Sequence, residues 1–171
     1  MGILAGLLAV LLVGAAHLPV PSGPSGPSAG RAGGDGGGEL SGFVVGSVPE
    51  RAGDDRADFA TEWGGVAFTS RVWEGAAPGG GYRVGLKVNV LRGAALTDLA
   101  ALRAFLAEYH EIDPGTWELD PFDHGTSPGR HGDGRAFWLE EPGLAVSLWL
   151  DPRRFGEPEL LTTAQAVQRK A

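Results

Sequence analysis

The strongest constraint on the fold of this chain is a strict alternation over nine residues, from Tyr82 to Val90, within the segment 82–92. Apolar side chains fill every second position, and the positions between them hold Arg83, Gly85, Lys87 and Asn89. A period of two is typical of a β-strand with one face on a core and the other toward water. In residues 144–150, leucine or valine fills every second position and alternates with Ala145, Ser147 and Trp149. We therefore expect the chain to fold around an antiparallel sheet.

The expected sheet has five strands, at residues 43–48, 66–74, 82–92, 136–140 and 144–150. A glycine-rich connector joins the second strand to the third, which favours an antiparallel pair. Pro142 and Gly143 join the fourth strand to the fifth, at the two central positions of a type II turn. The four carboxylates of residues 50–58 predict an exposed loop.

Two helices are expected to pack on one face of this sheet. The first begins after an N-cap at Thr97, and leucines recur along one side of it as far as Tyr109. The second begins near Pro158, with acidic residues in its first turn and basic residues in its last. This order of elements predicts an α+β fold, with an antiparallel sheet of about five strands and two helices on one face.

Upstream of this fold, an uncharged apolar run at residues 3–16 is followed by a tract rich in Pro, Ser and Gly. Fourteen residues is the length of the hydrophobic region of a signal peptide, whereas a spanning helix needs about 20. We expect residues 1–20 to form an apolar helix that is a signal peptide or a membrane anchor, and the length favours the signal. Residues 21–42 are expected to be a disordered linker, and residues 43–171 a single extracytoplasmic domain.

Composition narrows the range of functions. The net charge is −7, from 21 acidic and 14 basic residues, without a basic patch in the sequence. Nucleic-acid binding is not expected, because neutralisation of phosphates by Lys and Arg supplies most of its affinity. Membrane contact is expected only through the N-terminal segment, if that segment is retained. The chain has no cysteine, which excludes disulfide bonds, thiolate zinc sites and a catalytic thiol. We expect no cofactor.

The segment of residues 112–135 is where a chemical site is expected. Twenty-four residues without a clear element are long for a compact domain, and such loops are often functional. Histidines and carboxylates in and beside this loop are possible zinc ligands or general bases. The candidates are His110, Asp123, His124, His131 and Asp133. Their spacing matches no metal motif, so a solvated, turn-rich loop is the alternative.

Tryptophans suggest a second candidate surface. Trp73 and Trp149 lie on the sides of their strands opposite to the apolar rows, and Trp138 directly follows another aromatic residue in a strand. Indoles exposed together on one sheet face would form a surface for a partner or ligand. Packing in the core or at a sheet edge is the alternative.

The C-terminal third carries three motifs, Ala136-Phe-Trp-Leu139, Pro142-Gly-Leu-Ala-Val-Ser147 and Glu159-Leu-Leu-Thr-Thr-Ala-Gln-Ala-Val167. It resembles modules of unknown function in exported or membrane-anchored actinobacterial proteins, in which a Trp-containing strand, a Pro-Gly turn, a return strand and a helix close a half-wrapped sheet. Some such modules resemble lipoprotein-carrier folds, and others lie outside the membrane on regulators of sigma factors. The resemblance implies this fold and compartment, and it implies no site residue.

The sequence therefore predicts an exported or membrane-tethered module outside the cytoplasm. It is expected to be non-enzymatic and to bind an envelope protein or a small apolar ligand. Two other functions stay open. One is a metal-dependent or His/Asp hydrolase that uses residues 110–133, and the other is a lipid or lipoprotein carrier with an apolar groove between sheet and helices.

Overall fold

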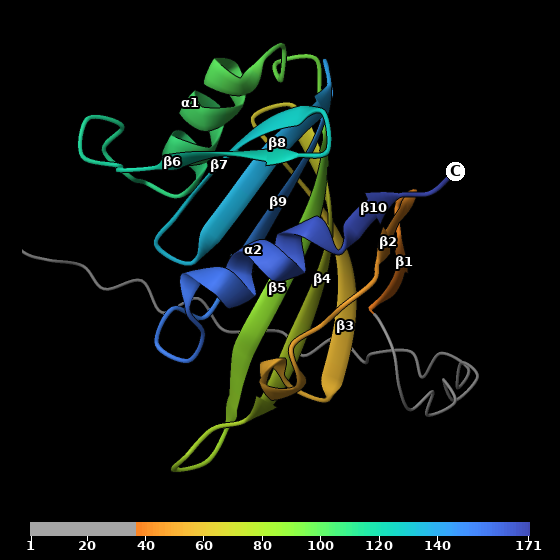
Figure 1. Cartoon of the computed structure of the whole chain (residues 1–171), viewed down its shortest axis with the longest axis vertical. Helices are drawn as coiled ribbons and strands as arrows, with labels where there is room; N and C mark the ends of the chain where they lie inside the picture. Colours follow the sequence, from red (N-terminus) through yellow and green to blue (C-terminus); the bar gives the residue numbers. More distant parts are fainter. Residues whose placement is uncertain (1–36) are drawn as a thin grey trace, which may run out of the picture. The chain divides into compact units, whose positions relative to one another are not determined.

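A seven-stranded antiparallel sheet is the centre of the structure, a computed structural model that describes residues 37–171 (Figure 1). Its strands lie in the order β3 (Asp55–Trp63), β4 (Val66–Ala76), β5 (Tyr82–Arg92), β9 (Leu144–Leu150), β8 (Arg135–Glu141), β7 (Ser127–Gly132) and β6 (Asp120–His124). The pairing of β5 with β9 joins two groups of strands that are each built from consecutive hairpins.

A second sheet has three strands, in the order β1 (Gly38–Leu40), β2 (Phe43–Val45) and β10 (Val167–Arg169). It joins the two ends of the described chain. Two α-helices, α1 (Leu99–Tyr109) and α2 (Glu157–Gln165), and a short 3-10 helix, η1 (Glu50–Ala52), complete the elements. The predicted α+β class is confirmed.

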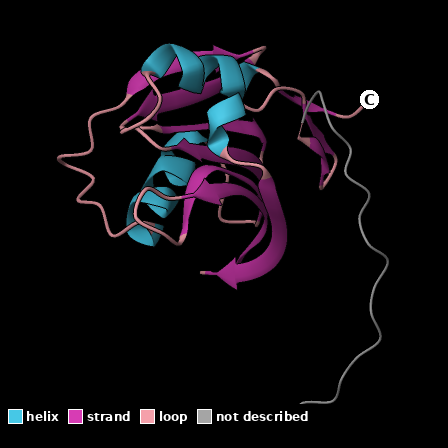
Figure 2. Ribbon diagram, turned by 90° about the horizontal axis from the view of Figure 1, so that it is seen from below, coloured by secondary structure: helices cyan, strands magenta, loops and turns pink. Residues whose placement is uncertain are grey.

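The two helices lie on opposite faces of the large sheet (Figure 2). On the α1 face, the buried core contains Phe68, Leu91, Leu102, Leu106 and Phe137. On the other face, which we call the α2 face, α2 and the small sheet cover a core that contains Val45, Val88, Trp138, Val146, Leu160 and Val167. Neighbours such as Phe137 and Trp138 thus enter different cores. The prediction of both helices on one face is wrong, because several strands are apolar on both sides.

The large sheet also has strands that were not expected. β3 includes part of the predicted acidic loop at residues 50–58, and its charged residues obscure the strand pattern. Gly64 and Gly65 have φ angles of +56° and +75° and form the two-residue turn that pairs β3 with β4. β6 and β7 lie in the segment 112–135, where no element was expected.

Several boundaries differ from the predictions. Asp98, not Thr97, caps α1, because the Asp98 carboxylate accepts a hydrogen bond of 2.8 Å from the backbone N–H of Ala101. α2 ends at Gln165, and the basic residues expected in its last turn follow it in and after β10. At the predicted type II turn, Gly143 has the required positive φ, +86°.

The N-terminal predictions are only partly covered. The predicted signal or anchor at residues 1–20 lies outside the described residues, as does most of the predicted linker at residues 21–42. β1 (Gly38–Leu40) falls within that linker range, so the folded domain begins earlier than residue 43. No helix within residues 37–171 is long and apolar enough to cross a membrane.

An aromatic cluster attaches β6 and β7 to the core. Trp138 is fully buried and stacks on His124, with ring centroids 4.1 Å apart and ring planes at 11°. Phe122 meets the edges of both Trp138 and His131, at centroid distances of 6.2 and 5.9 Å. The His124 Nε2 atom is buried and has no hydrogen-bond partner within the described chain. The histidine therefore acts here mainly as a flat packing surface.

This packing role predicts that a phenylalanine can replace His124. The His124→Phe variant keeps a ring over Trp138 and removes a buried polar atom without a partner, and such atoms cost about 1–3 kcal/mol. We expect it to unfold at the same temperature as the natural chain or higher, whereas His124→Ala unfolds several degrees lower because it leaves a cavity. Differential scanning calorimetry measures both. Equal losses of stability in the two variants would contradict the packing role.

Candidate functional site

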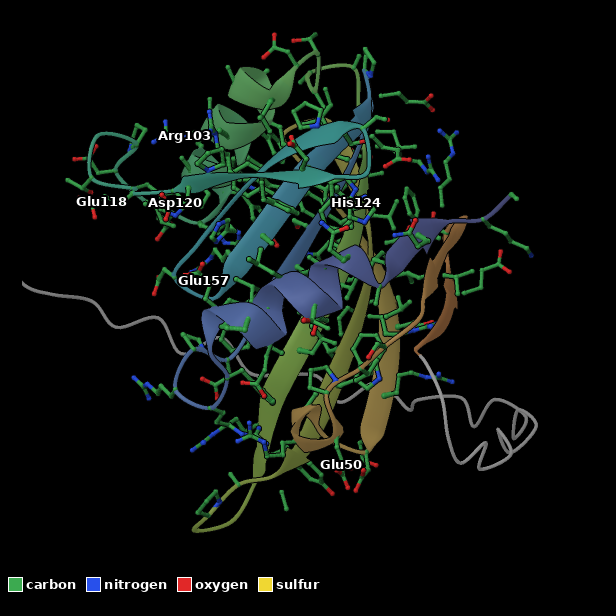
Figure 3. The ribbon with its side chains drawn as sticks, in the orientation of Figure 1. Glu50, Arg103, Glu118, Asp120, His124 and Glu157 are labelled. Carbon is green, nitrogen blue, oxygen red and sulfur yellow. The ribbon has the colours of Figure 1, made fainter. Side chains whose placement is uncertain are left out.

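The five candidate metal ligands do not come together in one place, although His131 and Asp133 line the same pocket beside the start of α2. His124 in β6 and His131 in β7 are buried on the α2 face, and His124 lies close to α2 (Figure 3). His110 follows α1 on the opposite face. Asp133 is exposed and forms an ion pair of 3.2 Å with Arg135, while the backbone of Asp123 contacts α2 through Gln165. Within residues 37–171, no group of three His, Cys, Asp or Glu residues could hold a metal ion.

The three candidate tryptophans do not share an exposed surface either. Trp73 and Trp138 are buried in the core of the α2 face, with 5% and 0% of their surface exposed. Trp149 is half-buried on the α1 face. The alternative of core packing therefore holds for the first two, and Trp149 alone faces a groove.

That groove lies on the α1 face, beyond the C-terminal end of the helix. Its inner part is a pocket of about 40 Å³ between α1, the segment after it and strands β5, β8 and β9. Its outer part, about 380 Å³, opens toward the loop after β9. Arg135 and Trp149 line both parts, and we call the two parts together the Arg135 groove. Its charged and aromatic lining includes Arg83, Lys87, His110, Trp117, Arg135 and Trp149.

Strand register builds the floor of the Arg135 groove. Trp149 in β9 lies opposite Lys87 in β5 on one side and opposite Arg135 in β8 on the other. Side chains directly opposite each other in a sheet are about 4.5–5.5 Å apart at Cβ and point to the same face. The three side chains therefore form a row across three strands, with an indole between two cations.

A second row, of polar side chains, separates these charges from the apolar residues under α1. Ser70 donates a hydrogen bond of 2.8 Å to the amide oxygen of Asn89, and the Asn89 amide nitrogen donates one of 3.0 Å to the Ser147 hydroxyl. All three side chains are buried. The row lets the sheet change from an apolar to a polar surface without leaving these amide and hydroxyl groups unpaired.

The groove presents more hydrogen-bond donors than free acceptors. Burial lowers the pKa of Lys87, and its ammonium forms no ion pair with any residue from 37 to 171. The Arg135 Nε and Trp117 Nε1 atoms are buried without a hydrogen-bond partner in the same part of the chain. Arg103 of α1 holds the segment that carries Trp117, by donating a hydrogen bond of 3.0 Å to the Trp117 carbonyl. Donors of this kind suit an anionic ligand.

The acceptors around the groove are already engaged. The last carbonyls of α1 accept hydrogen bonds from the backbone N–H groups of residues 110–112, where Glu111 adopts a left-handed conformation with φ +55°. The Asp151 carboxylate is buried and accepts a hydrogen bond of 3.1 Å from the backbone of Arg153. The Asp133 carboxylate is exposed and pairs with Arg135. An incoming anion would therefore compete with Asp133 alone for Arg135.

His110 is neutral in the folded protein at pH 7. Burial is the main reason that its pKa falls to about 4, and the positive charges of Arg135 and Lys87 lower it further. The imidazole therefore adds a polar wall to the Arg135 groove without adding charge.

Lys87, Asn89, Arg135 and Trp117 were not among the candidates from the sequence. A signal for two of them was present, because Lys87 and Asn89 lie on the polar side of the alternating strand at residues 82–92. An alternating strand shows which residues share a side, and it does not show which strand from another hairpin lies beside them. The partnership of Lys87 with Trp149 and Arg135 depends on the pairing of β5 with β9.

No protein-family model, curated protein or solved structure matches this chain. The chemistry of the site therefore follows from its geometry alone.

The lowered pKa of His110 predicts a specific pH dependence of stability. The unfolded chain binds a proton at this residue near pH 6.5, and the folded chain binds it only near pH 4. Between these values the unfolded state holds more protons, so the free energy of unfolding falls as the pH is lowered. We expect His110→Gln to lose less stability than the natural chain between pH 7 and pH 5, as measured by urea unfolding. A His110 ring resonance that titrates near pH 6.5 in NMR spectra of the folded protein would contradict the prediction.

Proposed function

We propose that this domain binds a small organic anion in the Arg135 groove and works as a non-enzymatic module outside the cytoplasm. The observation that carries the proposal is the row of Lys87, Trp149 and Arg135, in which two cations flank an indole on one sheet face. A carboxylate or phosphate group between the cations would accept from both. A planar or apolar part of the same ligand would pack on Trp149.

The dimensions of the groove support this division of the ligand. The inner pocket, about 40 Å³, has room only for a small polar group. The outer part, about 380 Å³, is within the range of small-molecule sites. The anionic end is therefore placed inside, near Lys87 and Trp117, and the larger part of the ligand outside, near Arg83 and Trp149.

Local charge also favours an anion, although the whole chain has a net charge of −7. At physiological salt, charges more than about 8 Å apart in water are largely screened, so the partly buried cations of the groove dominate its field. A purely apolar ligand is less suitable, because it would leave the ammonium of Lys87 and the Nε atom of Arg135 without acceptors.

The other two functions find less support. A hydrolase based on residues 110–133 would need histidines and carboxylates in one place, and His110 is separated by the sheet from His124 and His131. A lipid carrier would need an enclosed apolar space. A cavity of about 480 Å³ between η1 and α2 is open to solvent, and Arg51 and Glu159 form an exposed ion pair there. Placement outside the cytoplasm is supported by the leader-like sequence at residues 3–16.

Binding of benzoate and phenyl phosphate tests the proposal, with benzamide as the neutral counterpart of benzoate. We expect both anions, and not benzamide, to change tryptophan fluorescence and to give a calorimetric signal. The Lys87→Met and Arg135→Gln variants should each bind about tenfold more weakly or worse, since a hydrogen bond to a charged group contributes about 1.5–3 kcal/mol. Comparison of benzoate with phenyl phosphate shows which anionic group the groove prefers.

Lys170→Met is the matched control for Lys87→Met. It makes the same change of charge at an exposed residue that pairs with Glu39 in the small sheet. Equal binding by the two methionine variants, or binding of benzamide as tight as that of benzoate, would refute an anion site in the Arg135 groove.

A further inference from the structure

One edge of the seven-stranded sheet is open in the described chain. β3 pairs with β4 alone, and eight of its nine residues are exposed. Trp63 and Val66 flank a two-residue turn and therefore form a hydrogen-bonded pair. Along an antiparallel strand, residues that are hydrogen-bonded to the neighbouring strand alternate with residues that are not, and the pairing of β3 with β4 has no irregularity. The backbone N–H and C=O groups therefore point away from β4 at four residues: Arg56, Asp58, Ala60 and Glu62.

Two features of the opposite edge, at β6, hinder its pairing with a further strand. By the same alternation, Pro121 and Asp123 occupy the outward positions of this strand. Pro121 has no N–H to offer, and the outward carbonyl of Asp123 accepts a hydrogen bond of 2.7 Å from the side chain of Gln165. β3 is longer, contains no proline or lysine, and has no bulge. The charged residues of β3 are of both signs, so they do not by themselves repel a second copy, and a long edge without a covering element is a template for pairing with another strand.

We propose that a second copy of this chain occupies the open edge, through antiparallel pairing of the two β3 strands about a two-fold axis at Phe59. In this register all nine residues of each strand are paired. Residues whose backbone N–H and C=O groups point outward in one copy lie opposite such residues in the other, as hydrogen bonding between antiparallel strands requires. The result is one continuous sheet through both copies.

Charge selects this register. Arg56 lies opposite the partner's Glu62, and the two-fold axis forms the same pair a second time. Neither Arg56 nor Glu62 forms an ion pair within residues 37–171. Asp58 is already held by two hydrogen bonds of 2.6 Å from the buried Arg71. The next registers that keep outward-pointing positions opposite each other are shifted by two residues. They would place Asp58 opposite Asp58 or Glu62 of the second copy, and two carboxylates directly opposite each other are unfavourable.

Exposed aromatic surface lies at the same edge. Phe59 and Trp63 are 43% and 37% exposed, and both lie on the α1 side of β3. Trp63 also rests against Phe105 and Tyr109 of α1, at ring-centroid distances of 5.2 and 5.5 Å. In the proposed pairing the two Phe59 residues form a non-bonded pair, whose Cα atoms approach to about 4.5 Å. Each ring then covers the other.

Single cysteines test the axis directly, because the full-length chain has none of its own. In Phe59→Cys, the Cα atoms of the two cysteines lie at a separation that a disulfide bond allows, about 4.4–6.8 Å. In Thr61→Cys, each cysteine lies opposite Ala57, about 13 Å from its counterpart, so it serves as the matched control. We expect mild oxidation to yield at least about tenfold more covalent dimer from Phe59→Cys than from Thr61→Cys. Equal yields would overturn the proposed register.

Exchange of charges tests the interface without cysteines. Arg56→Glu and Glu62→Arg each replace two attractive pairs by two repulsive ones, so each should weaken dimerisation about tenfold or more. The double variant restores both pairs with reversed polarity and should dimerise within about threefold of the natural chain. Sedimentation equilibrium of the full-length chains measures this, and circular dichroism verifies that each variant is folded. A natural chain that is monomeric at all concentrations, or a dimer that does not respond to these changes, would overturn the proposal.

Discussion

Helix α1 is too short to cover the sheet face on which it packs. Eleven helical residues span about 16 Å, whereas the eleven residues of β5 span about 36 Å. Apolar residues such as Leu91 and Phe137 fill the covered part of this face. Beyond the helix, the same strands turn to Asn89 and Ser147, and then to Lys87 and Trp149. The Arg135 groove exists because the face must become polar where its cover ends.

The sequence was sufficient for the strands whose two sides differ in polarity. Residues 82–92 are such a strand, residues 144–150 have a regular row of aliphatic side chains, and both form strands in the structure. β3 was not recognised, because the carboxylates of residues 50–58 indicated an exposed loop, although Phe59 and Trp63 share one side of the strand. β6 and β7 are short and rich in Pro and Gly, and they depend on a contact with Trp138 that no local pattern shows. The apolar periodicity of a helix also does not show which face of the sheet the helix covers.

The candidate site shows a similar limit. Histidines were selected for their chemistry, yet His124 and His131 serve an aromatic cluster in the core. Lys87 was visible only as one polar residue on an alternating strand. Its significance depends on Trp149 and Arg135, which come from another hairpin and meet it through sheet pairing. Residue type selected side chains that lie apart in the fold, and long-range register determines which side chains are neighbours.

The protection of β6 has a consequence for how far association can extend. A sheet with two free edges can recruit a new molecule at each end, which leads to filaments. In this protein, Pro121 and the contact from Gln165 close one side of the large sheet. The proposed strand pairing at the other side would use the remaining open edge of the large sheet, so this sheet would stop growing at two copies.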